Sequence, residues 1–280
     1  MSIENDFKFS VLMSVYDKEK PDNLAQALKS ILKEQILKPD EMVIVVDGPV
    51  NADLQSVIQS YKAKYPGVLC VYQLDSNKGL GEALKFGLTK CSYNYVARAD
   101  SDDICMPERF QVQKEYFKRK PQLDILGSFI EEFIEDHNIP LNVKQMPLSH
   151  EAICKMAKLR NPINHMTVMF KKDKIIDCGS YRHLPYLEDY YLWVRAIFKG
   201  CNLENVNKCL VRARVGNGMV KRRGNKQYLK SWKTLNRFML RNGMISRLVY
   251  SRSIISIYVF IFMPLCLKEL AYKYILRNRC

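Results

Sequence analysis

The sequence predicts an α/β protein whose central sheet is mostly parallel and carries helices on both faces. Two observations lead to this fold class. Short apolar runs alternate with helical segments over the first half of the chain, and polar residues follow several of the runs. Such alternation favours right-handed crossovers, and ligands of these sheets bind outside the carboxyl ends of the strands. We therefore expect these polar residues to share one rim of the sheet.

The apolar runs of the first half are short enough to be buried strands, and helix-breaking residues separate them from the helices. Pro39 ends the first helical segment, and Pro107 opens the fourth because proline fits the first helical turn. In chain order, we expect strand Phe9–Val15, helix Asp22–Leu37, strand Glu41–Val46, helix Ala52–Tyr65, strand Val68–Gln73, helix Glu82–Thr89, strand Asn94–Ala99 and a helix from Pro107.

The second half of the chain is less regular. We expect strand Asp124–Phe133, a loop or hairpin at His137–Pro147, helix Ser149–Leu159, strand Met166–Phe170, helix Leu187–Phe198, strand and loop at Asn202–Arg214, and a basic helix at Lys226–Arg241. Glu188 and Asp189 suit the positive end of a helix dipole. The chain then divides into a body, residues 1–215, and a basic, partly apolar helical region, residues 216–280.

The positive charge of the chain is concentrated near its C-terminus. The formal net charge is +15, but residues 208–280 hold 17 lysines and arginines against one acid, whereas residues 1–207 have a net charge of −1. A nucleic-acid-binding protein that uses the basic region is one hypothesis. It is the weaker one because few aromatic side chains stand among the basic residues to stack on bases.

The nine cysteines follow no pattern that a disulfide framework or a zinc site requires. They form no CxxC pair, and no cysteine–histidine group has zinc spacing. This indicates buried thiols in a reducing compartment. The first ten residues also lack the basic and then apolar layout of a signal peptide. We therefore expect the folded body to lie in the cytoplasm.

The segment ARADSDD, residues 97–103, is the strongest functional signal. Its three carboxylates repel one another, so a fold that brings them together needs a compensating cation. Carboxylate oxygens suit Mg²⁺ or Mn²⁺, and such an ion usually also holds a diphosphate. An acidic turn that caps the following helix is the structural alternative, but the position directly after a buried strand favours the metal site.

Other polar residues could bind a nucleotide or supply a base. Asp47 could accept a hydrogen bond from the imide N–H of uracil, and Tyr16 could cover the base, although an Asp-Gly turn and a surface tyrosine are the alternatives. The loop at residues 77–81 could approach a ribose or phosphate, or be a simple turn. Glu188 and Asp189 could supply a general base, or only cap a helix.

Five segments in order resemble the family 2 glycosyltransferases, which have the GT-A fold. They cover roughly residues 9–200 and read SVLMSVYDKEKPDNLAQALKSIL, EMVIVVDGP, SNKGLGEALKFGL, YVARADSDDICMPERF and LPYLEDYYLWVRAI. The segments NPINHMTVMFKK and LVRARVGNGMVKRRG resemble the bacterial branch that builds O-antigen and exopolysaccharide repeat units. The QxxRW motif of processive members is absent, which favours transfer of a single sugar.

The resemblance implies a role for each matching residue. Asp47 matches the aspartate that binds uracil, and Asp189 matches the catalytic aspartate, with Glu188 beside it. The triplet at residues 100–102 matches the DxD motif, in which Asp102 is the closest ligand of Mn²⁺ or Mg²⁺ and Asp100 also lies near the ribose or sugar. The other expected nucleotide-sugar contacts are Ser14, Tyr16, Asn77, Gly79, Arg98 and Ser101, and the expected acceptor or diphosphate contacts are His165, Arg212, Arg214 and Arg222.

The resemblance also implies a reaction. It is the inverting transfer of one hexose, first of all galactose, from a UDP-sugar to a polyprenyl-diphosphate-linked sugar such as GlcNAc. Residues 1–106 would bind the nucleotide sugar and residues 107–215 the acceptor, and Asp189 would take the proton of the acceptor hydroxyl. An inactive scaffold of the same fold is an alternative that the intact acidic motifs disfavour.

The C-terminal region indicates contact with an anionic membrane surface. Ser253–Leu267 has 15 residues without a charge, which is short for a spanning helix of about 20, and Pro264 interrupts it. Basic residues flank it on both sides, as in an interfacial anchor. This hypothesis places the protein at the cytoplasmic face of the bacterial inner membrane, as a peripheral protein. A helix packed on the catalytic domain is the alternative.

Overall fold

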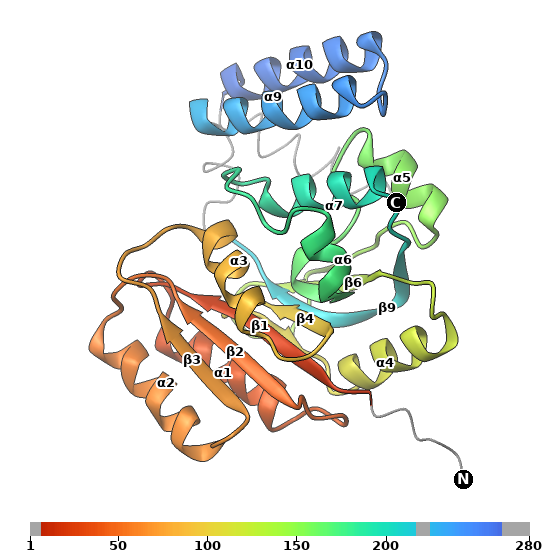
Figure 1. The fold of residues 1–280 in the computed structure, drawn as a ribbon. Coiled ribbons are helices and arrows are strands. Elements are labelled where there is room, and N and C mark those ends of the chain that lie inside the picture. The colour runs from red at the N-terminus through yellow and green to blue at the C-terminus, as the bar shows by residue number, and fades with distance from the viewer. Residues whose placement is uncertain (1–6, 217–224, 265–280) are drawn as a thin grey trace.

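The computed structural model describes residues 7–216 and 225–264. The strands in these ranges are β1 (Phe9–Val15), β2 (Glu41–Val46), β3 (Leu69–Gln73), β4 (Tyr95–Ala99), β5 (Ile104–Cys105), β6 (Ile125–Phe133), β7 (Asn142–Lys144), β8 (Met169–Lys171) and β9 (Leu203–Arg214). They form one sheet with the order β3-β2-β1-β4-β8-β6-β9-β5, and β7 pairs with β6 (Figure 1).

The helices up to residue 198 flank this sheet, and several helices begin after a side chain that caps them. The helices are α1 (Pro21–Leu32), α2 (Ala52–Lys64), α3 (Leu80–Lys90), α4 (Arg109–Arg119), α5 (His150–Ala157), α6 (Lys172–Asp177), α7 (Glu188–Phe198), α9 (Lys226–Arg241) and α10 (Arg247–Phe262), with a 3₁₀ turn η1 (His165–Thr167). Asn51 and Ser149, for example, accept hydrogen bonds from main-chain N–H groups of the first turns of α2 and α5.

The first half of the sheet is parallel, as the alternation predicts. β1 lies between β2 and β4, β3 lies outside β2, and all three pairings are parallel. The second half is mixed, because β8 runs antiparallel to both β4 and β6, whereas β6 and β9 are parallel. The carboxyl ends of β1, β2 and β4 therefore meet at one rim.

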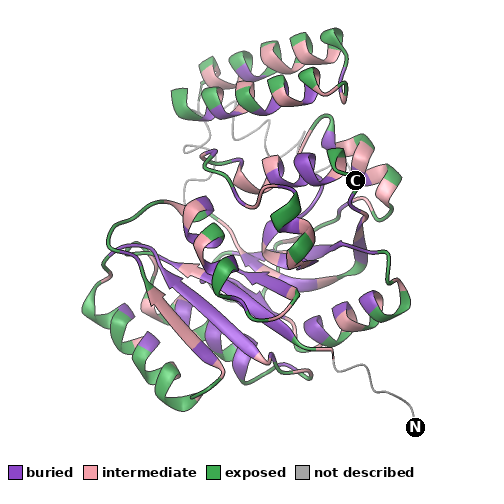
Figure 2. Cartoon of the chain, in the orientation of Figure 1, coloured by how far each residue is buried: buried purple, intermediate pink, exposed green. Residues whose placement is uncertain are grey.

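Apolar side chains pack on both faces of the sheet, so its central strands are buried on both sides, whereas β3 and β7 are partly exposed (Figure 2). Val11 and Met13 of β1 share a cluster with apolar residues of α1, α2 and α4. Leu12, which points to the opposite face, shares a second cluster with residues of α3, α5, α6 and α7. This alternation of neighbouring side chains explains why the runs are mostly apolar.

Some expected elements differ from the structure. The first helix ends at Leu32 rather than at residue 37, because Gln35 is buried and its amide donates to the carbonyl oxygens of Ser30 (2.8 Å) and Met106 (2.9 Å). The expected strand at Met166–Phe170 is instead η1 followed by β8. The two-residue strand β5 and the short helix α6 had no sequence prediction.

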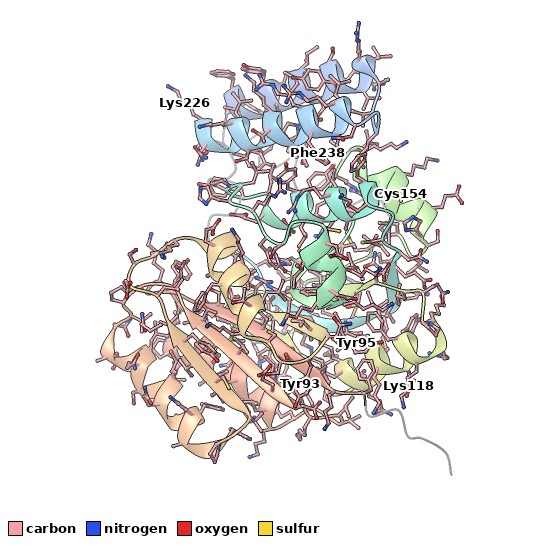
Figure 3. The ribbon with its side chains drawn as sticks, viewed as in Figure 1. Tyr93, Tyr95, Lys118, Cys154, Lys226 and Phe238 are labelled. Atoms are coloured by element: carbon pink, nitrogen blue, oxygen red, sulfur yellow. The ribbon has the colours of Figure 1, made fainter. Side chains whose placement is uncertain are left out.

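The helices α9 and α10 lie side by side at the top of the view in Figure 1, and α9 packs on α7. Tyr228, Leu235 and Met239 of α9 share an apolar cluster with Tyr190 and Val194 of α7. Figure 3 labels Phe238 on the side of α9 that faces α7, where its ring meets those of Tyr191 and Phe198 edge to face, at 5.4 and 5.8 Å between centroids. The division at residue 216 stays a prediction.

Candidate active site

The candidate residues of the first half of the chain lie at the rim formed by the carboxyl ends of β1, β2 and β4. Ser14 is half-buried near the end of β1, and Tyr16 follows it with 40% of its surface exposed. Asp47 follows β2, and the acidic turn of residues 100–103 follows β4. Ser101 donates a hydrogen bond from its hydroxyl to the carboxylate of Glu19, so the acidic turn is tied to the loop after β1.

A buried arginine holds the acidic turn through hydrogen bonds to its first carboxylate. Arg98 of β4 is 2% exposed, and both of its terminal nitrogens donate to the carboxylate of Asp100. Arg109 of α4 donates from Nη2 to the Arg98 carbonyl oxygen at 2.6 Å. The fork of two parallel hydrogen bonds fixes the orientation of the Asp100 carboxylate.

The acidic turn has the composition and spacing of a divalent-cation site. Asp100, Asp102 and Asp103 each offer a carboxylate oxygen, and these oxygens lie within 4.8 Å of one another. Burial, together with the charges of Asp100 and Glu19, raises the pKa of Asp102 to about 7. Burial and the neighbouring carboxylates also raise the pKa of Asp103. Both groups would therefore be stabilised by a bound cation.

Asp103 adds an observation that the DxD pattern alone does not supply. It is 4% exposed, and its Oδ1 accepts a hydrogen bond from the main-chain N–H of Arg214 at 2.8 Å. Its Oδ2 is buried and has no hydrogen-bond partner. An orphaned buried carboxylate oxygen is costly, and a cation bound between the three carboxylates would satisfy it. The residues present thus fit Mn²⁺ or Mg²⁺.

The side chain of Arg214, at the end of β9, connects the acidic turn to residues 133–135, at and just after the end of β6. Its Nε donates to the carbonyl oxygen of Asp102 at 3.3 Å, and its guanidinium lies 4.5 Å from the centroid of Phe133. Its Nη1 donates to two further carbonyl oxygens, those of Ile134 and Glu135, both at 3.2 Å. Sequence reasoning expected Arg214 at the acceptor, but did not foresee this main-chain role.

The other two arginines expected at the acceptor have different outcomes. Arg212 donates from Nε to the carboxylate of Glu131 at 2.9 Å, across the pairing of β6 and β9. Arg222 lies outside the described residues. A contact of either residue with a diphosphate stays a prediction.

Asp47 is held by the glycine loop that precedes α3. Its two carboxylate oxygens accept from the main-chain N–H groups of Lys78 at 2.7 Å and Gly79 at 2.9 Å. The loop comes so close to β2 that a Cβ on Gly48, whose φ is +86°, would lie 2.6 Å from the nitrogen of Asn77. Only glycine fits there. Each carboxylate oxygen keeps a second lone pair with which it could accept a ligand N–H.

The carboxylates at the start of α7 lie beside the same loop. A Cβ on Gly81 would lie 3.0 Å from Cγ of Glu188, so Gly81 lets the two segments touch. Burial raises the pKa of Glu188 to about 7, and the charge of Asp189 adds to the shift. Asp189 accepts a hydrogen bond from Nδ2 of Asn161 at 2.6 Å. Sequence reasoning missed Asn161, although it begins the segment NPINHMTVMFKK, which resembles the bacterial branch.

His165 lies beneath the site rather than on its surface. It is 8% exposed, and its Nε2 is 2.9 Å from the hydroxyl of Tyr181. Burial, with a contribution from the charge of Arg98, lowers the pKa of His165 well below its usual range, so the ring is neutral. Its ring also meets that of Trp193 edge to face. These contacts are those of a packed histidine, and a contact with the acceptor stays a prediction.

Comparison with known proteins agrees with this geometry. The sequence model of "Glycosyl transferase family 2" matches residues 10–176. The chain is 44% identical to "Amylovoran biosynthesis glycosyltransferase AmsE" of Erwinia amylovora, over 83% of this chain and 85% of that protein. It is 38% identical to "UDP-Gal:alpha-D-GlcNAc-diphosphoundecaprenol beta-1,3-galactosyltransferase" of Escherichia coli, over 97% of both proteins.

Solved structures share the fold at lower identity. S. aureus TarS 1–349 in complex with UDP-GlcNAc superimposes with a TM-score of 0.67 at 15% identity, over 96% of this chain and 73% of that one. At this identity the likeness concerns the fold alone.

Proposed function

The chain belongs to glycosyl transferase family 2 and has the GT-A fold, and from this premise we propose that it moves one hexose from a UDP-hexose to a sugar linked through diphosphate to a polyprenyl lipid. The family membership favours a glycosyltransferase over a nucleic-acid-binding protein.

One observation supports an intact catalytic site most strongly. The start of α7 touches the loop that holds Asp47, because a Cβ on Gly81 would lie 3.0 Å from Cγ of Glu188 and the same loop donates to Asp47 from the main-chain N–H groups of Lys78 and Gly79. Asp47 and the acidic turn follow neighbouring strands at one rim of the sheet, so the carboxylates of α7 adjoin the part of the rim that would hold the donor. A donor held by its base and diphosphate would reach the carboxylates of α7.

The donor half of the site would hold UDP through two sets of residues. Asp47 would accept the imide N–H of uracil, and the exposed ring of Tyr16 would lie beside the base. Asp100, Asp102 and Asp103 would hold Mn²⁺ or Mg²⁺, which when bound neutralises negative charge on a leaving diphosphate. Arg98 orients the Asp100 carboxylate towards this task.

The carboxylates of α7 would act on the acceptor. Asp189 would remove the proton of the acceptor hydroxyl as that oxygen attacks the anomeric carbon from the face opposite the diphosphate, so the anomeric centre inverts. Asn161 holds one oxygen of Asp189 and leaves the carboxylate oriented for this role. The pKa of Glu188, raised to about 7 by burial, keeps this side chain partly protonated near neutral pH and so reduces the negative charge beside the base. No covalent intermediate is needed.

Galactose is the first choice for the transferred sugar, because the relative that covers 97% of this chain carries UDP-Gal and GlcNAc-diphosphoundecaprenol in its name. Relatives named for amylovoran and for a lipid-linked acceptor also support a role in exopolysaccharide or O-antigen synthesis.

The helical pair α9–α10 would hold the enzyme at the membrane that carries such an acceptor. None of the helices within residues 7–216 and 225–264 combines the length and the hydropathy needed to span a bilayer. One face of α10 nevertheless exposes Leu248, Ile255, Val259 and Phe262, which are 56–79% exposed. Residues 225–264 hold seven lysines and arginines and no acid. An exposed apolar face on a helical pair that carries only positive charges fits an interfacial anchor on an anionic cytoplasmic leaflet.

The proposal is tested by a donor screen. Purified enzyme is incubated with Mn²⁺, a synthetic GlcNAc-diphosphate-lipid and each of UDP-galactose, UDP-glucose, UDP-GlcNAc and UDP-GalNAc, and the product is analysed by NMR. We expect transfer of one hexose, with UDP-galactose the best donor and with inversion at the anomeric carbon. Retention of configuration, or no transfer from any UDP-sugar, would contradict the proposal.

A further inference from the structure

Two buried thiols lie next to each other near the C-terminal end of α7, the end opposite to Glu188 and Asp189. Sγ of Cys178, just after α6, is 3.5 Å from Sγ of Cys201, in the turn between α7 and β9. The two residues are 4% and 5% exposed. The seven cysteines in the described part of the chain are all free, and sequence spacing did not single out this pair because 22 residues separate its members.

We propose that Cys178 and Cys201 form a reversible oxidation site, at which hydrogen peroxide converts the two thiols into a disulfide. The inference is independent of the proposed glycosyltransferase activity. Its geometry favours the step, since a disulfide needs an S–S separation of about 2 Å, so the sulfurs have only to approach by a further distance of about 1.5 Å.

The approach can come from the side chains and the flanking glycines. Cys178 stands in the turn after α6, Cys201 follows the turn after α7, and each adjoins a glycine with positive φ, namely Gly179 at +83° and Gly200 at +79°. The left-handed conformation of glycine tolerates such adjustment better than that of other residues. The main-chain N–H groups of the two cysteines donate to the carbonyl oxygens of Lys174 at 3.1 Å and Ala196 at 3.0 Å, so these bonds fix the main chain while the side chains rotate.

A small cavity gives the oxidant access to both sulfurs. It has a volume of about 160 Å³, and Cys178 and Cys201 line it together with two lysines and two aspartates, Lys174, Lys199, Asp124 and Asp177. Peroxide is scarcely larger than water and fits this space. Because the thiolate is the reactive form of cysteine, the two lysines favour the reaction and the two aspartates oppose it.

Arg195 donates to the main-chain carbonyl oxygen of Cys178 and so places a cation beside this thiol, which favours Cys178 as the thiol that reacts first. The hydrogen bond from the Cys201 thiol lowers the pKa of Cys178, and the charges of Arg195 and Lys199 act in the same direction, against the effects of burial and of Asp177. The pKa of Cys201 is raised, first of all by the same hydrogen bond. One thiol is thus poised as the nucleophile and its neighbour as the resolving thiol.

The chemistry balances with peroxide as the oxidant. The Cys178 thiolate attacks one peroxide oxygen, the O–O bond breaks, and the departing hydroxide takes a proton to become water, which leaves a sulfenic acid. The Cys201 sulfur, on losing its proton, attacks the Cys178 sulfur, the S–O bond breaks, and a second water leaves. The two thiols lose two electrons and two protons, and one peroxide is reduced to two waters.

The disulfide would close a ring that contains the whole of α7. The segment between the two cysteines carries Glu188 and Asp189, and the main-chain carbonyl oxygen of Cys178 accepts a hydrogen bond from Arg195 of the same helix. Closing the ring restricts the unfolded chain more than the folded one. Oxidation should therefore slow local opening of residues 179–200.

Peptide mapping tests the inference directly. The full-length chain, with Cys266→Ser and Cys280→Ser to prevent linkage through cysteines outside the described residues, is treated with peroxide, alkylated without reduction and digested with trypsin. We expect the peptides 175–182 and 200–208 to be recovered as one disulfide-linked pair, which separates on reduction with dithiothreitol. The linked pair should form at least tenfold faster than any oxidation product of Cys91. Cys91 is a matched control because it is buried and its pKa is raised to about 12.

Hydrogen exchange supplies the second readout, and it requires no substitution of Cys178 or Cys201. The oxidised protein should exchange amide hydrogens of residues 179–200 several-fold more slowly than the reduced protein, and dithiothreitol should reverse the change. The inference is overturned if Cys178 and Cys201 are both still alkylated after peroxide treatment, if Cys178 stops at the sulfinic acid without a link, or if Cys91 reacts as fast.

Discussion

Replacing Glu188 with glutamine removes one ionisable carboxyl from the start of α7 and keeps its shape. In the folded chain, burial raises the pKa of Glu188 from 4.5 to about 7. The folded state therefore binds a proton more tightly than the unfolded state, and the free energy of unfolding falls as pH rises between these two values. For this shift, the loss between pH 5.5 and pH 8.0 amounts to about 2 kcal/mol for this one group.

Glu188→Gln should abolish that part of the pH dependence. Urea unfolding, followed by circular dichroism at pH 5.5 and 8.0, gives the free energy of unfolding of both proteins, and the wild type should lose about 2 kcal/mol more than the variant over this interval. The raised pKa values of Asp102 and Asp103 affect both proteins alike, so the difference isolates Glu188. Parallel pH profiles would refute the reasoning that Glu188 is buried as a neutral acid.

Three further substitutions test the rim of the sheet. Asp102→Asn should weaken Mn²⁺ binding at least tenfold, measured by calorimetry with UDP present, because one charged ligand is lost; unchanged binding would exclude Asp102 as a ligand. Arg214→Met should weaken Mn²⁺ binding about tenfold, because the acidic turn loses the side chain that holds it. The control Lys208→Met removes an ion pair of the same strand and should leave Mn²⁺ binding unchanged. Equal effects of the two substitutions would contradict the role of Arg214 in holding the acidic turn. Gly48→Ala should lower the free energy of unfolding by about 2 kcal/mol or more, because its Cβ would meet the main chain at Asn77; a change below about 0.5 kcal/mol would contradict that crowding.

The parallel half of the fold could be predicted because periodicity and strand-end chemistry agree there. The bounds of β1 and β2 match the sequence expectations at Phe9–Val15 and Glu41–Val46, since both strands are buried on both faces and read as continuous apolar runs. The rim position of Asp47 and of the acidic turn follows from the same logic.

The features of the fold and of the candidate site that the sequence did not predict depend on contacts between residues far apart in the sequence. The early end of α1 results from the buried amide of Gln35, which bonds a carbonyl 71 residues away. The bond of Asn161 to Asp189 and the contact of Arg214 with the acidic turn likewise join distant segments. The strand β5 has two residues and exists only through its pairing with β9, so no local periodicity reveals it.

Comparison of Asp189→Asn with the wild type tests the central claim most directly. Transfer of galactose from UDP-galactose to GlcNAc-diphosphate-lipid is followed in a single turnover with Mn²⁺, and UDP binding is measured by calorimetry on the same preparations. Transfer should slow at least 100-fold in Asp189→Asn, as expected for loss of a general base. UDP affinity should stay within about twofold, because Asp189 takes no part in holding the nucleotide. Transfer at the wild-type rate in Asp189→Asn would contradict the assignment of Asp189 as the base.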